Sequence, residues 1–163
     1  MKTLLFSLLF LSACASKMSE ESTFFSKYEA LIARSPGKTK FFDCKKLDLK
    51  TSKTAMKHKS EIESQLQVMI KPNFDGVYRL VEIMGNGPSE WLLADCRTGK
   101  FTGASLSGDL LFSWDSAVVV QNPPNVSDTK ENYEASSQGL PKIYRVDDKG
   151  QFVLEENTIQ KAP

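Results

Sequence analysis

The side chains of this sequence that are best suited to chemistry are few and far apart along the chain. The only histidine, His58, lies between Lys57 and Lys59, whose charges repel a divalent cation. A nucleophile–histidine–acid site would have to use that histidine, and the serine-containing segment 103–108 lacks the Gly-x-Ser-x-Gly spacing of a nucleophile elbow. We expect that segment to form a loop. Because no Cys-x-x-Cys motif is present either, no metal site is expected. The sequence also leads us to assign no cofactor and no catalytic residue.

Carboxylates offer a different route to catalysis, because glycoside hydrolysis needs two carboxyl groups that face each other across a cleft. The adjacent acidic pairs 147–148 and 155–156 would point apart on a strand or lie in a turn. Four separated carboxylates are the other candidates: Glu82, Glu90, Asp95 and Asp109. The sequence leaves open whether any two of them meet, so a carboxylate-based enzyme stays as an alternative to a non-enzymatic protein.

Cys14 lies in a pattern that predicts covalent lipidation. Lys2 gives a short positive start, and residues 4–11 form an apolar run that a single serine interrupts. The run is shorter than the roughly 20 apolar residues that span a bilayer, but it suits a signal peptide. The tetrapeptide Leu11-Ser12-Ala13-Cys14 resembles a bacterial lipobox, in which the cysteine thiol takes a diacylglycerol and begins the mature protein. An ordinary signal peptide that ends at Ala13 is the alternative.

A lipidated cysteine would place the protein in the bacterial cell envelope. Two or three acyl chains hold a protein stably at a membrane, whereas a single chain is marginal. Ala15 follows the cysteine, and by the sorting rule of enteric bacteria a residue other than Asp there favours the outer membrane, facing the periplasm. We therefore divide the chain into a signal peptide over 1–13, a tether over 14–22, a single domain over 23–156 and a flexible tail over 157–163.

Two cysteines remain when Cys14 is lipidated. Export implies an oxidising compartment, in which an even pair commonly forms a bridge, so a disulfide between Cys44 and Cys96 is predicted. It would close a loop of about 50 residues and stabilise the domain by roughly 4 kcal/mol in the chain-entropy model. Two buried free thiols are the alternative.

Charge is unevenly distributed along a chain whose formal net charge is +1. Lysines dominate between Arg34 and Lys59, where Asp43 and Asp48 are the acidic residues. Such a stretch could lie against anionic lipid or a cell-wall polymer, or it could be a solvated face. No aromatic residue lies between Asp43 and Lys59, so a stacking platform for single-stranded nucleic acid is missing and no nucleic-acid partner is expected.

The apolar periodicity predicts an α+β domain, with two N-terminal helices followed by a mostly antiparallel β-sheet or a small β-sandwich. Helical spacing predicts helices from about Phe24 to Ile32 and over 60–69. Period two predicts strands at 77–83, 91–95, around 101, and at 110–114, 117–121, 143–146 and 152–155. Segment 41–49 is ambiguous and suggests an irregular strand, whereas 122–140 is expected to be a long exposed loop that is available for contacts.

Several motifs between Ile62 and Leu154 occur in a definite order. Asn73-Phe74-Asp75-Gly76-Val77-Tyr78 is followed by Asp95-Cys96-Arg97-Thr98-Gly99-Lys100, and a Tyr144…Phe152 hairpin closes the region. These roughly 100 residues resemble a functionally uncharacterised family of small secreted bacterial proteins with an Asn-Phe-x-Gly-x-Tyr … Asp-x-x-Thr-Gly-Lys pattern. The resemblance implies no activity. Many members carry two cysteines in the glycine turn after the tyrosine strand, but residues 82–90 have none, and a Cys44–Cys96 link would take their place.

Aromatic residues on the expected strands supply the remaining candidates for function. Trp91, Trp114, Tyr78 and Phe101 could form a recognition surface, although aromatics at strand spacing are also typical of a core. We therefore expect a membrane-anchored, non-enzymatic binding module for an envelope protein or peptidoglycan, and an inhibitor of cell-wall hydrolases would be one version of it. A carboxylate enzyme that acts on wall glycan and a structural envelope component are the alternatives.

Overall fold

The computed structural model of this chain describes residues 23–38, 44–68, 71–128, 130–134 and 140–155. The predicted signal peptide, the lipidation site at Cys14, the tether and the tail over 157–163 lie outside the described residues. Within the described ranges, no helix combines the length and the apolar character that crossing a membrane requires.

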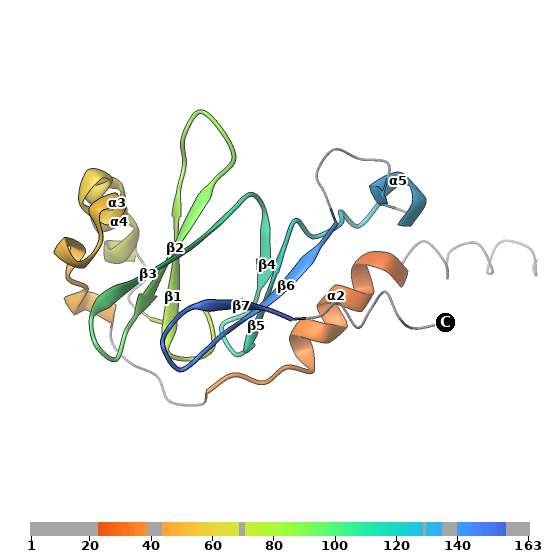
Figure 1. Cartoon of the computed structure of the whole chain (residues 1–163), viewed down its shortest axis with the longest axis horizontal. Helices are drawn as coiled ribbons and strands as arrows, with labels where there is room; N and C mark the ends of the chain where they lie inside the picture. Colours follow the sequence, from red (N-terminus) through yellow and green to blue (C-terminus); the bar gives the residue numbers. More distant parts are fainter. Residues whose placement is uncertain (1–22, 39–43, 69–70, 129, 135–139, 156–163) are drawn as a thin grey trace, which may run out of the picture.

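Two antiparallel sheets form the centre of the domain (Figure 1). The first sheet has the order β1 (Tyr78–Ile83), β2 (Glu90–Asp95) and β3 (Lys100–Ser107). The second sheet has the order β4 (Leu110–Phe112), β5 (Val118–Gln121), β6 (Lys142–Val146) and β7 (Phe152–Leu154). Helices and two antiparallel sheets confirm the predicted α+β class, and the strands other than β3 begin and end within a few residues of their predicted bounds.

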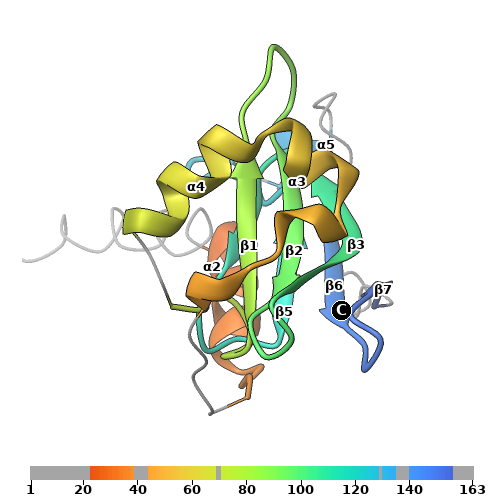
Figure 2. The same ribbon diagram turned by 90° about the vertical axis from the view of Figure 1, so that its left-hand side faces the viewer.

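Helical segments lie on the outside of both sheets. They are α2 (Thr23–Ala33), the 3-10 turns η1 (Cys44–Lys46) and η2 (Leu49–Thr51), α3 (Lys53–Lys57), α4 (Lys59–Val68) and α5 (Lys130–Glu134). Figure 2 shows α3 and α4 across the outer face of the first sheet, whereas α2 lies beside the second sheet on the far side of the molecule in Figure 1. The domain therefore has four layers, in the order helices, sheet, sheet and helix.

Alternation along the strands explains how both faces of each sheet are buried. Val81 and Ile83 of β1 pack with Ala55 and Ile62 of the α3–α4 layer, whereas Leu80 points to the other side and packs between the sheets. Successive residues of a strand point to opposite faces, so a sheet that is covered on both sides needs apolar side chains at consecutive positions.

The same alternation appears in the second sheet. Val119 of β5 packs between the sheets, whereas Val118 and Val120 pack against Tyr28 and Ile32 of α2. Three valines in a row, all 0% exposed, therefore serve two separate apolar clusters. The continuous apolar run of β5 follows from its position between the opposite sheet and α2.

A disulfide between Cys44 and Cys96 links η1 to the end of β2, with the two Cα atoms 4.7 Å apart. The predicted pairing is confirmed. Next to it, the Asp48 N–H donates to the Gly99 carbonyl at 2.6 Å, and the Phe101 N–H donates to Thr51 Oγ1 at 2.9 Å. The segment that precedes α3 is thus fixed to the first sheet by a covalent bond and by hydrogen bonds.

Side chains cover part of the outer edge of β1, where backbone groups would otherwise be unpaired. The Asn73 amide donates to the Leu80 carbonyl at 2.9 Å and accepts the Leu80 N–H at 2.8 Å, as a neighbouring strand would. Gln65 Nε2 donates to the Glu82 carbonyl at 2.6 Å. An edge that is satisfied in this way is protected against pairing with another chain.

Three local predictions were wrong. The described part of segment 41–49 forms η1 and η2, with an isolated parallel bridge between Asp48 and Lys100 as its strand-like feature. Segment 103–108 forms the second half of β3, in which Ala104 and Leu106 are buried and the serines between them are exposed. Segment 122–140 contains α5, whose Tyr133 is 2% exposed and packs on Phe24 with ring centroids 5.5 Å apart, so this segment is not wholly an exposed loop.

Candidate functional site

A polar hollow of about 420 Å³ opens where the β1–β2 hairpin, the β3–β4 turn and the end of β5 meet. Its lining residues are Pro88, Ser89, Ser107, Gly108, Asp109, Gln121 and Asn122. Hydroxyl, amide and backbone groups with one carboxylate thus surround the space. The hollow offers many hydrogen-bonding groups and little charge, which suits an uncharged polar ligand.

The floor of the hollow depends on two residues with left-handed backbone. Gly108 has φ +86°, and a Cβ added there would lie 2.7 Å from Asn122 Oδ1, so a side chain at position 108 would collide. Asn122 itself has φ +52°, a conformation that asparagine tolerates better than most residues. These two turns direct β3 into β4 and end β5 at the same place.

Backbone hydrogen bonds join the three segments that line the hollow. The Gly108 N–H donates to the Ser89 carbonyl at 2.8 Å, and the Trp91 indole N–H donates to the Gly108 carbonyl at 2.9 Å. The Asn122 N–H donates to the Asp109 carbonyl at 2.8 Å. The lining is therefore held in place before any ligand arrives, which lowers the entropic cost of binding.

Two tyrosines, the buried Tyr133 and the half-buried Tyr144, bond to residues that line the hollow. Gln121 Nε2 donates to the Ser107 carbonyl at 2.6 Å, and Gln121 Oε1 accepts from the Tyr144 hydroxyl at 3.2 Å. The Tyr133 hydroxyl donates to the Asn122 carbonyl. Burial raises the pKa of Tyr133 to about 12, so its hydroxyl stays protonated as a donor throughout the neutral range.

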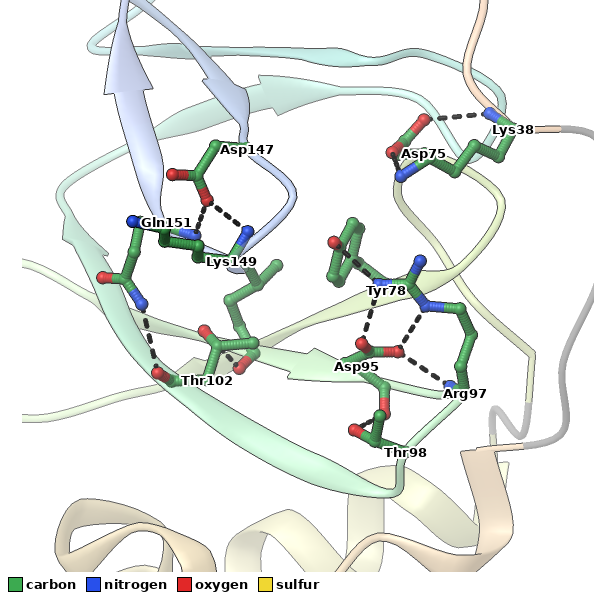
Figure 3. Close-up of polar contacts among 11 residues, drawn as sticks. Lys38, Asp75, Tyr78, Asp95, Arg97, Thr98, Thr102, Asp147, Lys149 and Gln151 are labelled. Atoms are coloured by element: carbon green, nitrogen blue, oxygen red, sulfur yellow. Dashed lines mark hydrogen bonds and ion pairs between the residues drawn. The ribbon is translucent and has the colours of Figure 1, made fainter.

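A second polar cluster lies at the other end of the first sheet (Figure 3). Arg97 binds the Asp95 carboxylate through two parallel contacts, Nε to Oδ1 at 2.9 Å and Nη2 to Oδ2 at 2.8 Å, and Nη2 also donates to the Tyr78 hydroxyl at 3.0 Å. Burial acts to raise the pKa of Asp95, but the hydrogen bonds from Arg97 outweigh it and lower that pKa below its ordinary value. Burial raises the pKa of Tyr78, which is 0% exposed.

Lys38 and Asp75 extend this cluster toward the segment that follows α2, as Figure 3 shows. The Lys38 N–H donates to Asp75 Oδ1 at 2.9 Å, and Lys38 Nζ lies 3.7 Å from Asp75 Oδ2 and 5.6 Å from the centre of the Tyr78 ring. Each cation of the cluster already has a carboxylate partner, so we assign the cluster to fixing the end of the first sheet and the segment after α2, and not to ligand binding.

The four carboxylates singled out in the sequence are dispersed. Glu82 shares a strand face with Leu80 toward the second sheet, whereas Glu90 shares a face with Leu92 toward the helices, so these two lie on opposite sides of one sheet. Asp95 is bound by Arg97. Asp109 is the one of the four that lines the hollow, and Glu82 lies behind it, accepting from the Ser89 hydroxyl at 2.6 Å.

The four aromatic residues proposed as a recognition surface do not form one. Tyr78 is 0% exposed and packs between the sheets, whereas Phe101 is 5% exposed and packs under the helices. Trp91 is half-buried, with its ring centroid 5.6 Å from that of Phe112. Trp114 alone is exposed, at 52%. The prediction was wrong because both faces of each sheet are covered, so strand aromatics have little access to solvent.

The residues that line the hollow were missed in the sequence, apart from Asp109. The sequence marks several of these residues only as turns, because Gly108-Asp109 and Asn122-Pro123 each follow the end of a strand. Nothing in the sequence says that the two turns meet. Among the residues that the structure describes, no group of three or more histidine, cysteine or acidic side chains is placed to hold a metal ion.

No protein-family model, no curated protein and no solved structure matches this chain. The functional interpretation of the hollow therefore rests on the geometry of the chain itself.

Proposed function

We propose that this chain is a lipid-anchored, non-enzymatic binding protein of the bacterial envelope, and that the polar hollow binds uncharged sugar units of the cell wall. The lipobox pattern that ends at Cys14 supports the anchor and the compartment. The disulfide between Cys44 and Cys96 agrees with an oxidising environment.

The observation that carries the proposal is the rigid, hydrogen-bonding lining of the hollow. Its volume of about 420 Å³ lies in the size range of small-molecule sites, roughly 300–1,000 Å³. Hydroxyl and amide side chains together with exposed turn backbone complement the hydroxyl and acetamido groups of a glycan. Asp109 adds one acceptor that can take two hydroxyl donors.

The placement of the carboxylates supports binding over hydrolysis. A glycosidase needs two carboxyl groups on either side of one scissile bond, commonly about 5–10 Å apart. Among the residues that line the hollow, Asp109 is the one carboxylate. Glu82 accepts from the Ser89 hydroxyl but does not line the hollow, Glu90 lies on the helix face of the first sheet, and Asp95 is occupied by Arg97. A glycan in the hollow would therefore meet one acid and no opposing partner.

The test measures the binding of N-acetylglucosamine oligomers, which are uncharged, to the full lipidated protein in detergent by calorimetry. We expect the double variant Ser107→Ala and Asp109→Ala to bind at least about tenfold more weakly, because two groups that bond the ligand are lost. The control is Ser105→Ala with Asp148→Ala, which removes the same groups from exposed positions outside the hollow.

Equal affinities for the two double variants would contradict the assignment of the hollow. Release of shorter glycans over time would show an enzyme instead. Cross-linking in native envelopes gives an independent check, since a single stoichiometric protein partner without glycan would favour a protein-binding module.

A further inference from the structure

The helical layer over the first sheet carries a concentration of positive charge. Segment 44–68 contains six lysines against three carboxylates, in a chain whose net charge is +1. Four of these lysines are exposed and lie on η1, η2 and α3, namely Lys46, Lys50, Lys53 and Lys57. We call these four residues the lysine layer. Figure 2 shows that α3 and the segment before it cover this face of the molecule.

The carboxylates near the lysine layer are committed to other groups. Asp48 Oδ1 accepts the Lys50 N–H at 3.0 Å as the cap of η2. Glu61 accepts the Met84 N–H at 2.9 Å, and Glu63 lies 3.7 Å from Lys59 Nζ. In the part of the chain that the structure describes, none of the four ammonium groups lies within ion-pair distance of a carboxylate. Their charges are available to a partner.

This arrangement lowers the stability of the free protein. Lys53 and Lys57 are four residues apart in α3 and therefore lie on one side of the helix, where like charges repel. The layer cannot relax by moving away, because Leu49 and Ala55 are buried in the cluster below it and the disulfide fixes Cys44. Ammonium groups without counter-charges on a fixed stretch of backbone form a positive patch that attracts an anionic surface.

We propose that the lysine layer docks on the free carboxylates of peptidoglycan stem peptides. The inference rests on the proposed function for the lipid anchor and the compartment. The anchor would enter the domain at α2, which lies on the far side of both sheets from α3 (Figure 1). Packed layers are about 10 Å apart, so the lysine layer is roughly 30 Å from α2 and faces away from the membrane that holds the anchor.

Peptidoglycan fits this surface better than an anionic membrane or single-stranded nucleic acid does. An anionic membrane would have to be reached from the side opposite the anchor. Single-stranded nucleic acid would need aromatic side chains for stacking, and the exposed large apolar side chain on α3 is Met56, at 44% exposure. A wall polymer meets the protein from the periplasmic side and needs only well-placed ammonium groups.

The experiment measures cosedimentation of the full lipidated protein with purified peptidoglycan, in native form and with its carboxyl groups amidated. The variant K46Q/K50Q/K53Q/K57Q is compared with K27Q/K130Q/K142Q/K149Q, which removes the same charge from exposed positions on or beside α2, α5, β6 and the β6–β7 turn. We expect the first variant to bind native peptidoglycan more weakly by a factor of up to about ten, since exposed charge pairs each contribute modestly. The control variant keeps the wild-type affinity.

Two further measurements keep the test decisive. Raising the salt concentration from 50 to 300 mM must weaken the binding of the wild type to native peptidoglycan but not to the amidated form. This comparison needs no variant. The Ser107→Ala and Asp109→Ala variant is measured on the amidated form, so a failure of the hollow is seen separately from a failure of the lysine layer.

Three results would overturn the docking proposal. The first is an equal loss of peptidoglycan binding for both lysine variants. The second is a loss of binding by the lysine-layer variant that is the same on native and on amidated peptidoglycan. The third is a loss of binding by this variant that appears only when both proteins are tested on phosphatidylglycerol vesicles. The last result would assign the layer to a membrane.

Discussion

At the scale of single residues, buried charged side chains in this domain are matched to specific acceptors. Arg79 is 1% exposed on the helix side of β1, where it donates to the Lys71 carbonyl at 3.1 Å and to the Gln65 carbonyl at 3.4 Å. Gln65 lies in the last turn of α4, where carbonyl groups lack partners within the helix and a cation is favoured. Burial lowers the pKa of Arg79, and the two carbonyl groups replace part of its lost hydration.

Asp95→Asn tests the pair with Arg97. Because Arg97 holds the folded-state pKa of Asp95 below its ordinary value of 3.8, the pair contributes stability above that pH and loses it as the pH falls through the lowered pKa. We expect the variant to lose about 1–3 kcal/mol of unfolding free energy at pH 7, as for a hydrogen bond to a charged group. Urea unfolding at pH 7 and at pH 2–3 measures this difference.

The loss should shrink at the acid end, because protonation of the wild-type carboxyl is favoured in the unfolded chain before it occurs in the folded one, which reduces the stability that the pair supplies. Asp148→Asn, in an exposed turn, is the matched control and should change little at either pH. An equal loss of unfolding free energy at both pH values would show that Asp95 stabilises the domain through packing and neutral hydrogen bonds and not through its charge.

At the scale of elements, side chains cover part of the outer edge of the first sheet. β1 is an edge strand, and the Asn73 amide occupies the backbone groups of Leu80 there. The register of β1 on β2 pairs Leu80 with Leu93, which places both side chains in the cluster between the sheets. Edge protection and core packing therefore act on the same residue of β1.

Asn73→Ala removes both hydrogen bonds to Leu80. We expect a loss of about 1–3 kcal/mol in unfolding free energy, because a backbone donor and acceptor at a largely buried residue are left unpaired. Chemical denaturation measures the loss, and light scattering on storage should show faster association through the uncovered edge. The control Asn86→Ala lies in the exposed β1–β2 hairpin loop and should match the wild type in both measurements. Equal behaviour of the two variants would show that water replaces the amide at no cost.

At the scale of the whole molecule, the anchor and the two proposed surfaces define one orientation. α2 follows the proposed tether, and α3 with its lysines lies beyond both sheets (Figure 1). The hollow opens beside the β3–β4 turn, where the first sheet passes into the second. A protein held at α2 would present its cations away from the membrane. Binding of wall glycan and of stem-peptide carboxylates could then occur together, and the avidity of two linked contacts exceeds either affinity.

Cys14→Ser tests the anchor on which this orientation depends. We expect the wild type to incorporate labelled palmitate and to fractionate with membranes, and the variant to lose both properties, because no thiol remains for the diacylglycerol. Metabolic labelling followed by fractionation measures both. The variant Cys44→Ser with Cys96→Ser keeps Cys14 and should remain labelled. An unlabelled wild type that is released into the soluble fraction would support an ordinary signal peptide.

The strands of this domain could largely be predicted from the sequence, because alternation and turn residues are local signals. Val77 to Ile83 and the hairpin around the Asp147–Gly150 turn appear close to their expected positions. The parity of the cysteines likewise pointed to the Cys44–Cys96 pair that the structure contains. Segment 103–108 was missed because glycine and serine are typical of loops, and only packing of Ala104 and Leu106 makes it a strand.

The sequence by itself determined the class of the fold and the period of most strands, because both depend on the types of neighbouring residues. The export signal stays a prediction from the sequence. Only the tertiary structure decided which faces are buried and which turns meet. Tyr78 and Phe101 are buried because helices and a second sheet cover both sides of their sheet, and no local pattern reports that cover. The hollow joins Ser89, Asp109 and Gln121 from three separate turns and strand ends, and contacts between distant segments depend on the packing of the whole chain.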